Sequence, residues 1–267
     1  MPDNSKNLTP LAAPSPIGMP PAGPSFTTEA TRFPAELLIW LSPAFPIGSF
    51  AYSQGLEWAV ECGWINDSDT LQTWLRTLTM HGSLHNDLVL LSEAYRAPNQ
   101  AALDQIAELG AALQPSAERS AEANQQGASF LIAYQESWAG HESSAQTAAA
   151  RPNTVHTNDD PNRITTDQPV TLPIAVAIAA RSNELPLAPT LEAYAIAFHS
   201  NLVSAAIRLS VIGQFDGQRI LAALMPDIRV VSQTATRATL DDLGSTTFAS
   251  DIAAMKHETQ HTRLFRS

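Results

Sequence analysis

The segment His257-Glu258-Thr259-Gln260-His261 has the residue types and the spacing of a metal site. In zinc peptidases, two histidines one helical turn apart ligate Zn²⁺, and the glutamate beside the first one activates a water molecule. A catalytic zinc also needs a third protein ligand, and residues 262–267 contain no His, Asp or Glu. A zinc-dependent metallopeptidase is therefore an alternative that the sequence permits but does not favour.

The helix expected to carry this segment has an apolar stripe formed by Phe248, Ile252 and Met255. At about 100° per residue, His257 and His261 lie on the other side of that helix. We therefore expect the stripe to face the core and both histidines to project toward solvent or a partner.

Three further histidines have simple structural explanations. His81 and His85 are also spaced by four residues, and in a helix that continued through Gly82 they would lie on or beside an apolar stripe. His199 adjoins the apolar face of another expected helix. We interpret all three as core or turn residues rather than metal ligands.

Ser53 and the pair Glu57 and Glu61 also suggest chemistry at first sight. Residues 51–55 resemble a nucleophile elbow, but that motif follows a strand, and the prolines Pro43 and Pro46 argue against a central strand here. Ser53 is more simply the start of a helix. Glu57 and Glu61 lie one helical turn apart, which is typical of a solvated acidic surface, and a di-iron bundle would need more inward carboxylates.

Two short segments instead have the composition of binding surfaces. The first is a Pro/Gly turn, residues 45–52, that carries Phe50 and Tyr52. The second is residues 262–267, which place cationic and apolar side chains at the end of an acidic sequence: Arg263, Leu264, Phe265 and Arg266. Arginine and aromatic residues are enriched in interface hot spots. We predict partner binding here, and we expect residues 262–267 to be removable without loss of the helical fold.

The composition excludes several functional classes. The 267 residues include 15 Lys and Arg against 26 Asp and Glu, a net charge of −11, which argues against nucleic acid or anionic membrane as the main partner. The two lysines, Lys6 and Lys256, do not lie in a glycine-rich loop, so the P-loop signature is absent. The sequence also contains no Gly-x-Gly, so the Rossmann signature is absent. The sequence has one cysteine, Cys62, and it has neither an apolar run long enough to span a membrane nor a secretion signal. We therefore expect a cytoplasmic protein without its own cofactor.

Apolar periodicity predicts an all-α fold, a single-domain bundle of antiparallel helices. Leu191, Tyr194, Phe198, Leu202, Ala205 and Leu209 form the apolar face of one long helix, which we expect to end at Gly213, with Asp216 capping the next helix. Another helix has a stripe that includes Leu71 and Leu78 and begins near Asp67. The remaining helices are expected near 33–41, 50–62, 99–113 and 117–139.

Polar and proline-rich composition divides the chain further. Residues 1–28 hold seven of the 19 prolines and are expected to be a disordered tail. Residues 29–261 would form the helical domain, interrupted by a flexible polar insertion at about 140–171. Residues 262–267 would be a C-terminal partner-binding tail.

Four long segments in order give the chain a specific resemblance. The first is Ser42-Pro43-Ala44-Phe45-Pro46-Ile47-Gly48-Ser49-Phe50-Ala51-Tyr52-Ser53-Gln54-Gly55-Leu56-Glu57. The second and third are Asn201-Leu202-Val203-Ser204-Ala205-Ala206-Ile207-Arg208-Leu209 and Gly213-Gln214-Phe215-Asp216-Gly217-Gln218-Arg219. The fourth runs from Asp241-Asp242-Leu243-Gly244 through Met255-Lys256-His257-Glu258 to Arg263-Leu264-Phe265-Arg266-Ser267. Together they resemble the urease accessory protein UreF family over roughly 33–267.

The resemblance implies an all-α homodimer without enzymatic activity. Members of this family join UreD (also called UreH) and the GTPase UreG in a complex that inserts nickel into apo-urease. The UreF member bridges the other two, and GTP is bound by UreG.

The resemblance also assigns expectations to single residues. In family members the C-terminal segment docks on UreD. By their positions in the shared motifs, the resemblance also places Phe50 and Arg263 at or near partner surfaces, with Tyr52, Phe265 and Arg266 in support. The family more often has an aromatic residue at the position of His261, so the zinc-like spacing is interpreted as accidental.

Overall fold

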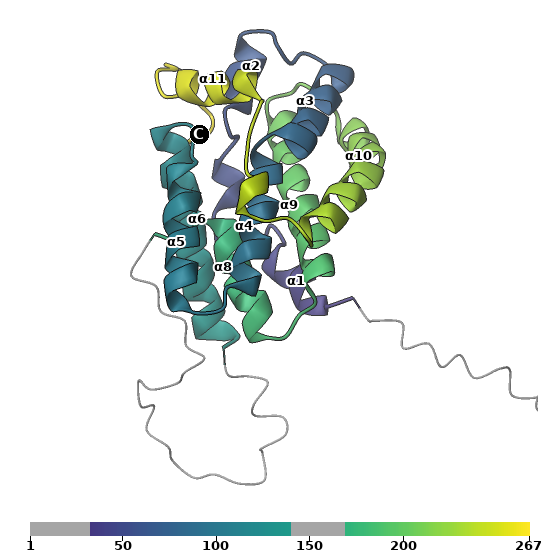
Figure 1. The fold of residues 1–267 in the computed structure, drawn as a ribbon. Coiled ribbons are helices and arrows are strands. Elements are labelled where there is room, and N and C mark those ends of the chain that lie inside the picture. The colour runs from purple at the N-terminus through teal and green to yellow at the C-terminus, as the bar shows by residue number, and fades with distance from the viewer. Residues whose placement is uncertain (1–32, 140–168) are drawn as a thin grey trace, which may run out of the picture. The chain divides into compact units, whose positions relative to one another are not determined.

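The computed structural model describes residues 33–139 and 169–267, and the fold in these ranges is all-α, without a β-strand. Figure 1 shows the helices along the chain. Their bounds are α1 Ala35–Trp40, α2 Leu56–Glu61, α3 Ser68–His81, α4 Ser83–Arg96, α5 Gln100–Ala112, α6 Ala117–Ser137, α8 Leu172–Ser182, α9 Leu187–Arg208, α10 Gln214–Ala235 and α11 Phe248–His257. Two 3-10 turns, η1 Ser49–Ala51 and η2 Leu240–Asp242, complete them. The predicted fold class is confirmed.

The described residues, 33–139 and 169–267, form one compact unit. The expected tail, 1–28, lies outside the described residues, as does most of the expected insertion, 140–171. Its last residues are described, and Val170 and Thr171 are buried where the chain enters α8. No helix in the described ranges is long and apolar enough to cross a membrane.

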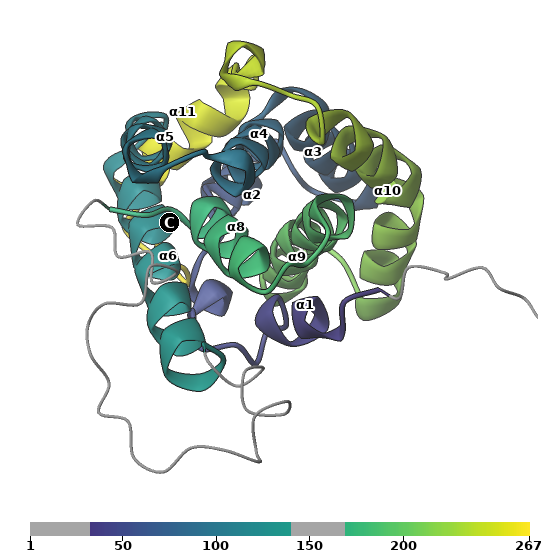
Figure 2. The same cartoon turned by 60° about the horizontal axis from the view of Figure 1, so that its bottom comes forward.

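The core is built around α8. Figure 2 shows α8 and α9 enclosed by the other helices. Every residue from Pro173 to Ala180 is buried, and the alanines among them let α4 and α6 approach closely. Gly127 of α6 packs so closely on the residues just before this helix that a Cβ atom there would lie 1.8 Å from the carbonyl oxygen of Val170.

The long helix α9 confirms the expected apolar face. Leu191, Tyr194, Phe198, Leu202 and Ala205 are all buried. The helix ends earlier than expected, at Arg208, because Ser210 adopts a left-handed backbone conformation with φ 62°. Gly213 is instead the N-cap of α10, and Asp216 lies in the first turn of α10, where it forms an ion pair with Arg219.

The helix expected to begin near Asp67 has a clear start signal. The Asp67 carboxylate accepts a hydrogen bond from the Thr70 amide at 2.8 Å, and the Thr70 hydroxyl completes a capping box. The helix does not continue through Gly82, where extended backbone separates α3 from α4. His81 is therefore exposed, and the ring of half-buried His85 bonds to the carbonyl oxygen of Asp242 at 2.9 Å.

The contact between α2 and α11 depends on a glycine. Gly55 precedes α2 with φ 79°, a conformation that L-residues rarely adopt. A Cβ atom on Gly55 would lie 2.6 Å from the backbone nitrogen of Ala254 in α11. The absence of a side chain at this position lets α11 pack directly on the start of α2.

Candidate functional site

Residues 258–267 form an ordered segment that returns from α11 across α2 and α6. Arg266 donates its backbone N–H to the carbonyl oxygen of Ala51 at 2.8 Å, and the Ser53 amide donates to the carbonyl oxygen of Ser267 at 2.9 Å. Phe265 is 3% exposed and joins the core, and the guanidinium of Arg208 lies 4.3 Å from the centre of its ring. The expectation that this segment can be removed without loss of the helical fold stays a prediction, although the buried Phe265 shows that the segment closes part of the core.

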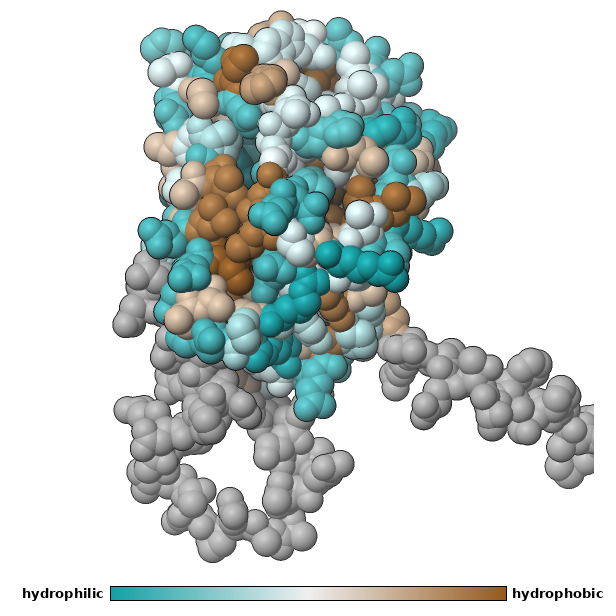
Figure 3. Space-filling model, viewed as in Figure 1, coloured by the Kyte–Doolittle hydropathy of each residue, from teal (hydrophilic) through white to brown (hydrophobic). Residues whose placement is uncertain are grey.

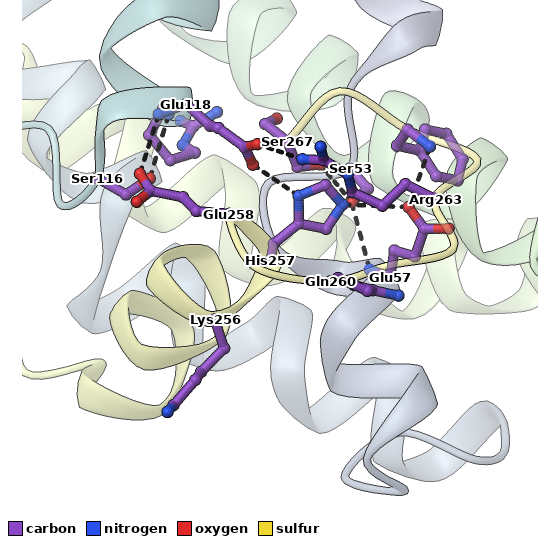
Figure 4. A network of polar contacts seen from close by, with 12 residues as sticks. Ser53, Glu57, Ser116, Glu118, Lys256, His257, Glu258, Gln260, Arg263 and Ser267 are labelled. Atoms are coloured by element: carbon purple, nitrogen blue, oxygen red, sulfur yellow. Dashed lines mark hydrogen bonds and ion pairs between the residues drawn. The ribbon is translucent and has the colours of Figure 1, made fainter.

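The buried carboxylate of Glu57 anchors this segment. One oxygen, Oε1, accepts the Leu264 amide at 2.6 Å, and the other, Oε2, accepts the Phe265 amide at 3.0 Å. The same Oε2 lies 3.1 Å from Nε2 of His257. Figure 4 shows Glu57 and His257 within this network. Three donors from α11 and the final segment thus satisfy a single side chain of α2.

His257 connects Glu57 to a second carboxylate. Its Nδ1 lies 2.7 Å from Oε2 of Glu118, at the start of α6, and the imidazole is completely buried. The other oxygen of Glu118 binds the guanidinium of Arg263. An ionised carboxylate only accepts hydrogen bonds, so the arrangement is satisfied when both ring nitrogens of His257 carry a proton. Arg263 supplies a positive charge beside Glu118.

Glu258 fixes the end of α11 to the start of α6. Its Oε1 accepts the backbone N–H groups of Ala117 and Glu118, at 2.7 and 3.2 Å. These amides have no acceptor within their own helix, and the positive end of the helix dipole favours a carboxylate there. The glutamate that would activate water in a zinc peptidase is therefore a helix cap.

These contacts do not support the zinc interpretation. Both ring nitrogens of His257 already face carboxylates, Glu258 caps α6, and His261 is exposed. Among the residues that the structure describes, no group of three His, Cys, Asp or Glu side chains is arranged to hold a metal ion.

The predicted orientation of α11 is wrong. Phe248, Ile252 and Met255 are 70%, 44% and 51% exposed, whereas His257 is completely buried. The reason is that Glu57 and Glu118 supply charged hydrogen-bond acceptors on the inner side, and burying His257 between them satisfies these carboxylates. The expectation for Glu57 is wrong for the same reason, because it is buried, whereas Glu61 is exposed as expected.

The residues expected to bind partners divide into exposed and buried ones. Phe50 is 66% exposed and Leu264 is 61% exposed, and Arg263 and Arg266 are also exposed. Arg266 pairs through its backbone with Ala51, which follows Phe50, so the final segment and the η1 turn lie side by side. We call Phe50, Leu264 and Arg266 the tail patch.

Tyr52 and Phe265 lie beneath this surface. Tyr52 is 4% exposed and donates its hydroxyl to Gln125 of α6 at 2.9 Å. Burial raises the pKa of Tyr52, and the neighbouring Arg266 guanidinium opposes that shift. Both aromatic residues therefore position the backbone of the tail patch rather than expose their rings.

Sequence reasoning missed the acidic residues that hold the segment, and Glu122 is a further one. It forms an ion pair with Arg119 and accepts the Ser267 hydroxyl, and both partners are buried with it. A glutamate in a helix normally indicates a solvated face. The available signal was local, since Glu57 is flanked by core residues of the same short helix, Leu56 and Ala59.

The amino-acid sequence is similar to known proteins over most of its length. Residues 65–225 match the family model UreF. A protein named urease accessory protein UreF from Rhodopseudomonas palustris (strain HaA2) is 43% identical over 235 residues, which cover 87% of this chain and 92% of that relative. Its namesake from Bradyrhizobium diazoefficiens is 44% identical, with 87% and 90% covered. The protein of that name from Methylobacterium radiotolerans is 41% identical, with 93% and 100% covered.

Proposed function

The chain belongs to the UreF family of urease accessory proteins, and we propose that within urease maturation it acts as a non-enzymatic adaptor. In this proposal it bridges UreD (UreH) and the GTPase UreG, so that GTP-dependent nickel insertion into apo-urease can occur. Nickel is the cargo of the complex, and GTP belongs to UreG. We also propose that the protein is a homodimer and is located in the cytoplasm.

The observation that carries the proposal is the tail patch on an anchored segment. Phe50 and Leu264 expose apolar side chains next to the cation Arg266, and the Glu57 hydrogen bonds fix the backbone beneath them. A preorganised surface loses little conformational entropy when a partner binds. Arginine beside exposed apolar groups is a composition typical of interface hot spots.

An adaptor role also agrees with the contacts of the candidate catalytic side chains, which form hydrogen bonds within the fold. His257 and Glu258, the two residues of the zinc-like pattern that face the fold, are engaged in hydrogen bonds that hold α11 and α6 together. Ser53, the nucleophile candidate, is completely buried and donates its hydroxyl to the carbonyl oxygen of Ser267. These contacts give His257, Glu258 and Ser53 structural roles.

A bridging assay tests the proposal directly. UreD is immobilised and mixed with UreG and GTP, with and without this chain, and the amount of UreG retained is measured. We expect retention only when the chain is present. In parallel, apo-urease is activated with UreD, UreG, nickel and GTP, and we expect urea hydrolysis to depend on the added chain. Equal UreG retention or equal activation without the chain would overturn the adaptor role.

Leu264→Ser is the sharpest variant for this assay. The Leu264 side chain is 61% exposed, and its backbone amide, which binds Glu57, is kept. Arg263→Ala is less specific because the guanidinium also binds Glu118 within the chain. Ile132→Ser, a change of equal exposure on α6, is the matched control and should leave both assays unchanged.

A further inference from the structure

The exposed side of α11 is an unpartnered apolar surface. Phe248, Ile252 and Met255 follow one another at helical spacing and are 44% to 70% exposed, whereas the inner side of the helix packs on α2 through Ala253 and Ala254. Figure 3 shows exposed apolar side chains over α11, near the top of the view. The stripe spans about 10 Å, at about 1.5 Å per residue, which equals two turns of a helix.

A groove of about 620 Å³ continues this stripe toward α3. One wall is α3 with Thr73, Trp74 and Thr77, and the other is the start of α11 with Phe248 and Ala249. Trp64, 42% exposed, closes one side. We call this groove, together with Ile252 and Met255, the α3–α11 groove. It lies on the opposite side of α11 from His257 and is separate from the tail patch.

The tryptophan wall is held in place before any partner binds. The Trp64 ring lies 5.0 Å from Trp58 in an edge-to-face arrangement and 6.5 Å from Trp74. Trp58 and Trp74 are partly buried and pack against the core. A fixed aromatic wall offers a large contact area at little entropic cost, which is the property of interface anchors.

The charge at the groove is negative. Asp69 is the only charged residue among the described residues that line it. Asp67 caps the same end of α3, and its hydrogen bonds to Thr70 lower the pKa of its carboxyl group, so it remains ionised. Lys256, the cation of α11, is outside the lining.

We propose that the α3–α11 groove binds an amphipathic helix of a partner protein, with apolar side chains against Trp64 and Phe248 and with Lys or Arg facing Asp69. Helices recognised in grooves present residues at i, i+3, i+4 and i+7 to an apolar surface of this kind. The basic flank follows from charge complementarity with the acidic margin.

A second copy of the chain fits this surface less well. A two-fold symmetric contact uses the same patch on both subunits, so it would bring the Asp67 and Asp69 carboxylates of both copies into one interface. Each chain also carries a net charge of −11. Like charges placed together oppose association, so the groove favours a different, basic partner.

The test uses two synthetic helical peptides with the full-length chain. One is a Leu/Lys peptide with leucines at i, i+3, i+4 and i+7, and the other has Glu in place of every Lys. Binding is measured by calorimetry and by tryptophan fluorescence. We expect the Leu/Lys peptide to bind with a blue-shifted emission, and the Leu/Glu peptide to bind at least about tenfold more weakly.

Matched variants separate the groove from general charge attraction. Phe248→Ser leaves the net charge unchanged and should weaken Leu/Lys binding at least about tenfold, as the loss of a hot spot does. Phe215→Ser alters a phenylalanine that is 81% exposed on α10 and should leave binding unchanged. Asp69→Asn should reduce the salt dependence of binding.

Three results would overturn the proposal. The first is equal Leu/Lys affinity in Phe248→Ser and wild-type protein, and the second is no binding of this peptide at all. The third is a wild-type dimer that Phe248→Ser converts to a monomer in sedimentation, since the occupant would then be a second copy. The assay contains no urease component, so its outcome is independent of the bridging test.

Discussion

Glu57 and His257 are 200 residues apart in the chain, and their side chains meet at 3.1 Å in the interior. This contact ties α2 to α11 at the point where the final segment begins. It also aligns the carboxylate so that its two oxygens accept the backbone amides of Leu264 and Phe265. The exposed tail patch therefore depends for its geometry on a buried contact between a carboxylate and an imidazole.

Glu57→Gln should destabilise the chain although it preserves side-chain size. A carboxamide offers one oxygen, so its NH₂ group must face one of the three donors that now bind the carboxylate. Loss of charged hydrogen bonds in a buried site costs about 2–4 kcal/mol. Urea unfolding of the full chain measures this loss, and hydrogen exchange at the Leu264 and Phe265 amides should become faster.

Glu61→Gln is the control for that change. Glu61 lies one turn further along α2, is exposed, and accepts a hydrogen bond from Gln260. Its loss should alter the free energy of unfolding by less than about 0.5 kcal/mol, as for most surface substitutions. Equal destabilisation by the two variants would contradict the assignment of Glu57 as the anchor.

Gly55→Ala should separate α11 from α2. The added Cβ would lie 2.6 Å from the Ala254 nitrogen, and alanine is also strained at φ 79°. Gly63→Ala introduces the same backbone strain at φ 80°, with nothing within 4 Å of the new atom. We expect Gly63→Ala to cost about 1–2 kcal/mol, and Gly55→Ala to cost at least about 2 kcal/mol more, from thermal and urea unfolding. Similar losses of unfolding free energy in the two variants would mean that α11 shifts to make room for the added methyl group at little cost.

Leu264→Ser tests the tail patch as a partner surface. Because the side chain is mostly exposed, the free energy of unfolding should change by less than about 0.5 kcal/mol. If Leu264 is a hot spot, the affinity for UreD should fall by about tenfold or more, measured by titration onto immobilised UreD. Wild-type affinity in this variant would assign the interface to another surface.

Periodicity predicted the elements whose burial is driven by apolar side chains alone. The face of α9 from Leu191 to Ala205 and the start of α3 at Asp67 both follow from local patterns, because helix phase and capping are set by neighbouring residues. The same reasoning gave the wrong face for α11. There the apolar stripe is exposed, and His257 is buried by carboxylates that come from α2 and α6.

The candidate site was predictable only where it is exposed. Phe50, Leu264 and Arg266 were singled out because aromatic, apolar and cationic residues in short terminal or turn segments are unusual on an acidic chain; their exposure is confirmed, and their role in partner binding stays a prediction. The flanking core residues Leu56 and Ala59 indicate that Glu57 is buried, but the anchoring roles of Glu57 and Glu118 depend on partners 139 to 208 positions away. No local spacing rule relates residues at such separations.

His199 should make stability depend on pH. Its ring is completely buried, with Nε2 2.9 Å from the Thr79 hydroxyl, and burial lowers its pKa from 6.5 to about 4. As the pH falls from about 6.5 to about 4, the unfolded chain binds a proton at His199 that the folded chain does not. The free energy of unfolding should therefore decrease over this range, by about 3 kcal/mol from this group.

His199→Gln removes this titration, and its amide can still donate a hydrogen bond to Thr79. Urea unfolding at about pH 7 and about pH 4.5 should show a smaller loss of stability on acidification in His199→Gln than in the wild-type chain. His81→Gln, which alters an exposed histidine at the end of α3, should keep the wild-type pH dependence. If His199→Gln also keeps it, the folded chain accepts the proton at His199, and the acid sensitivity must come from other groups.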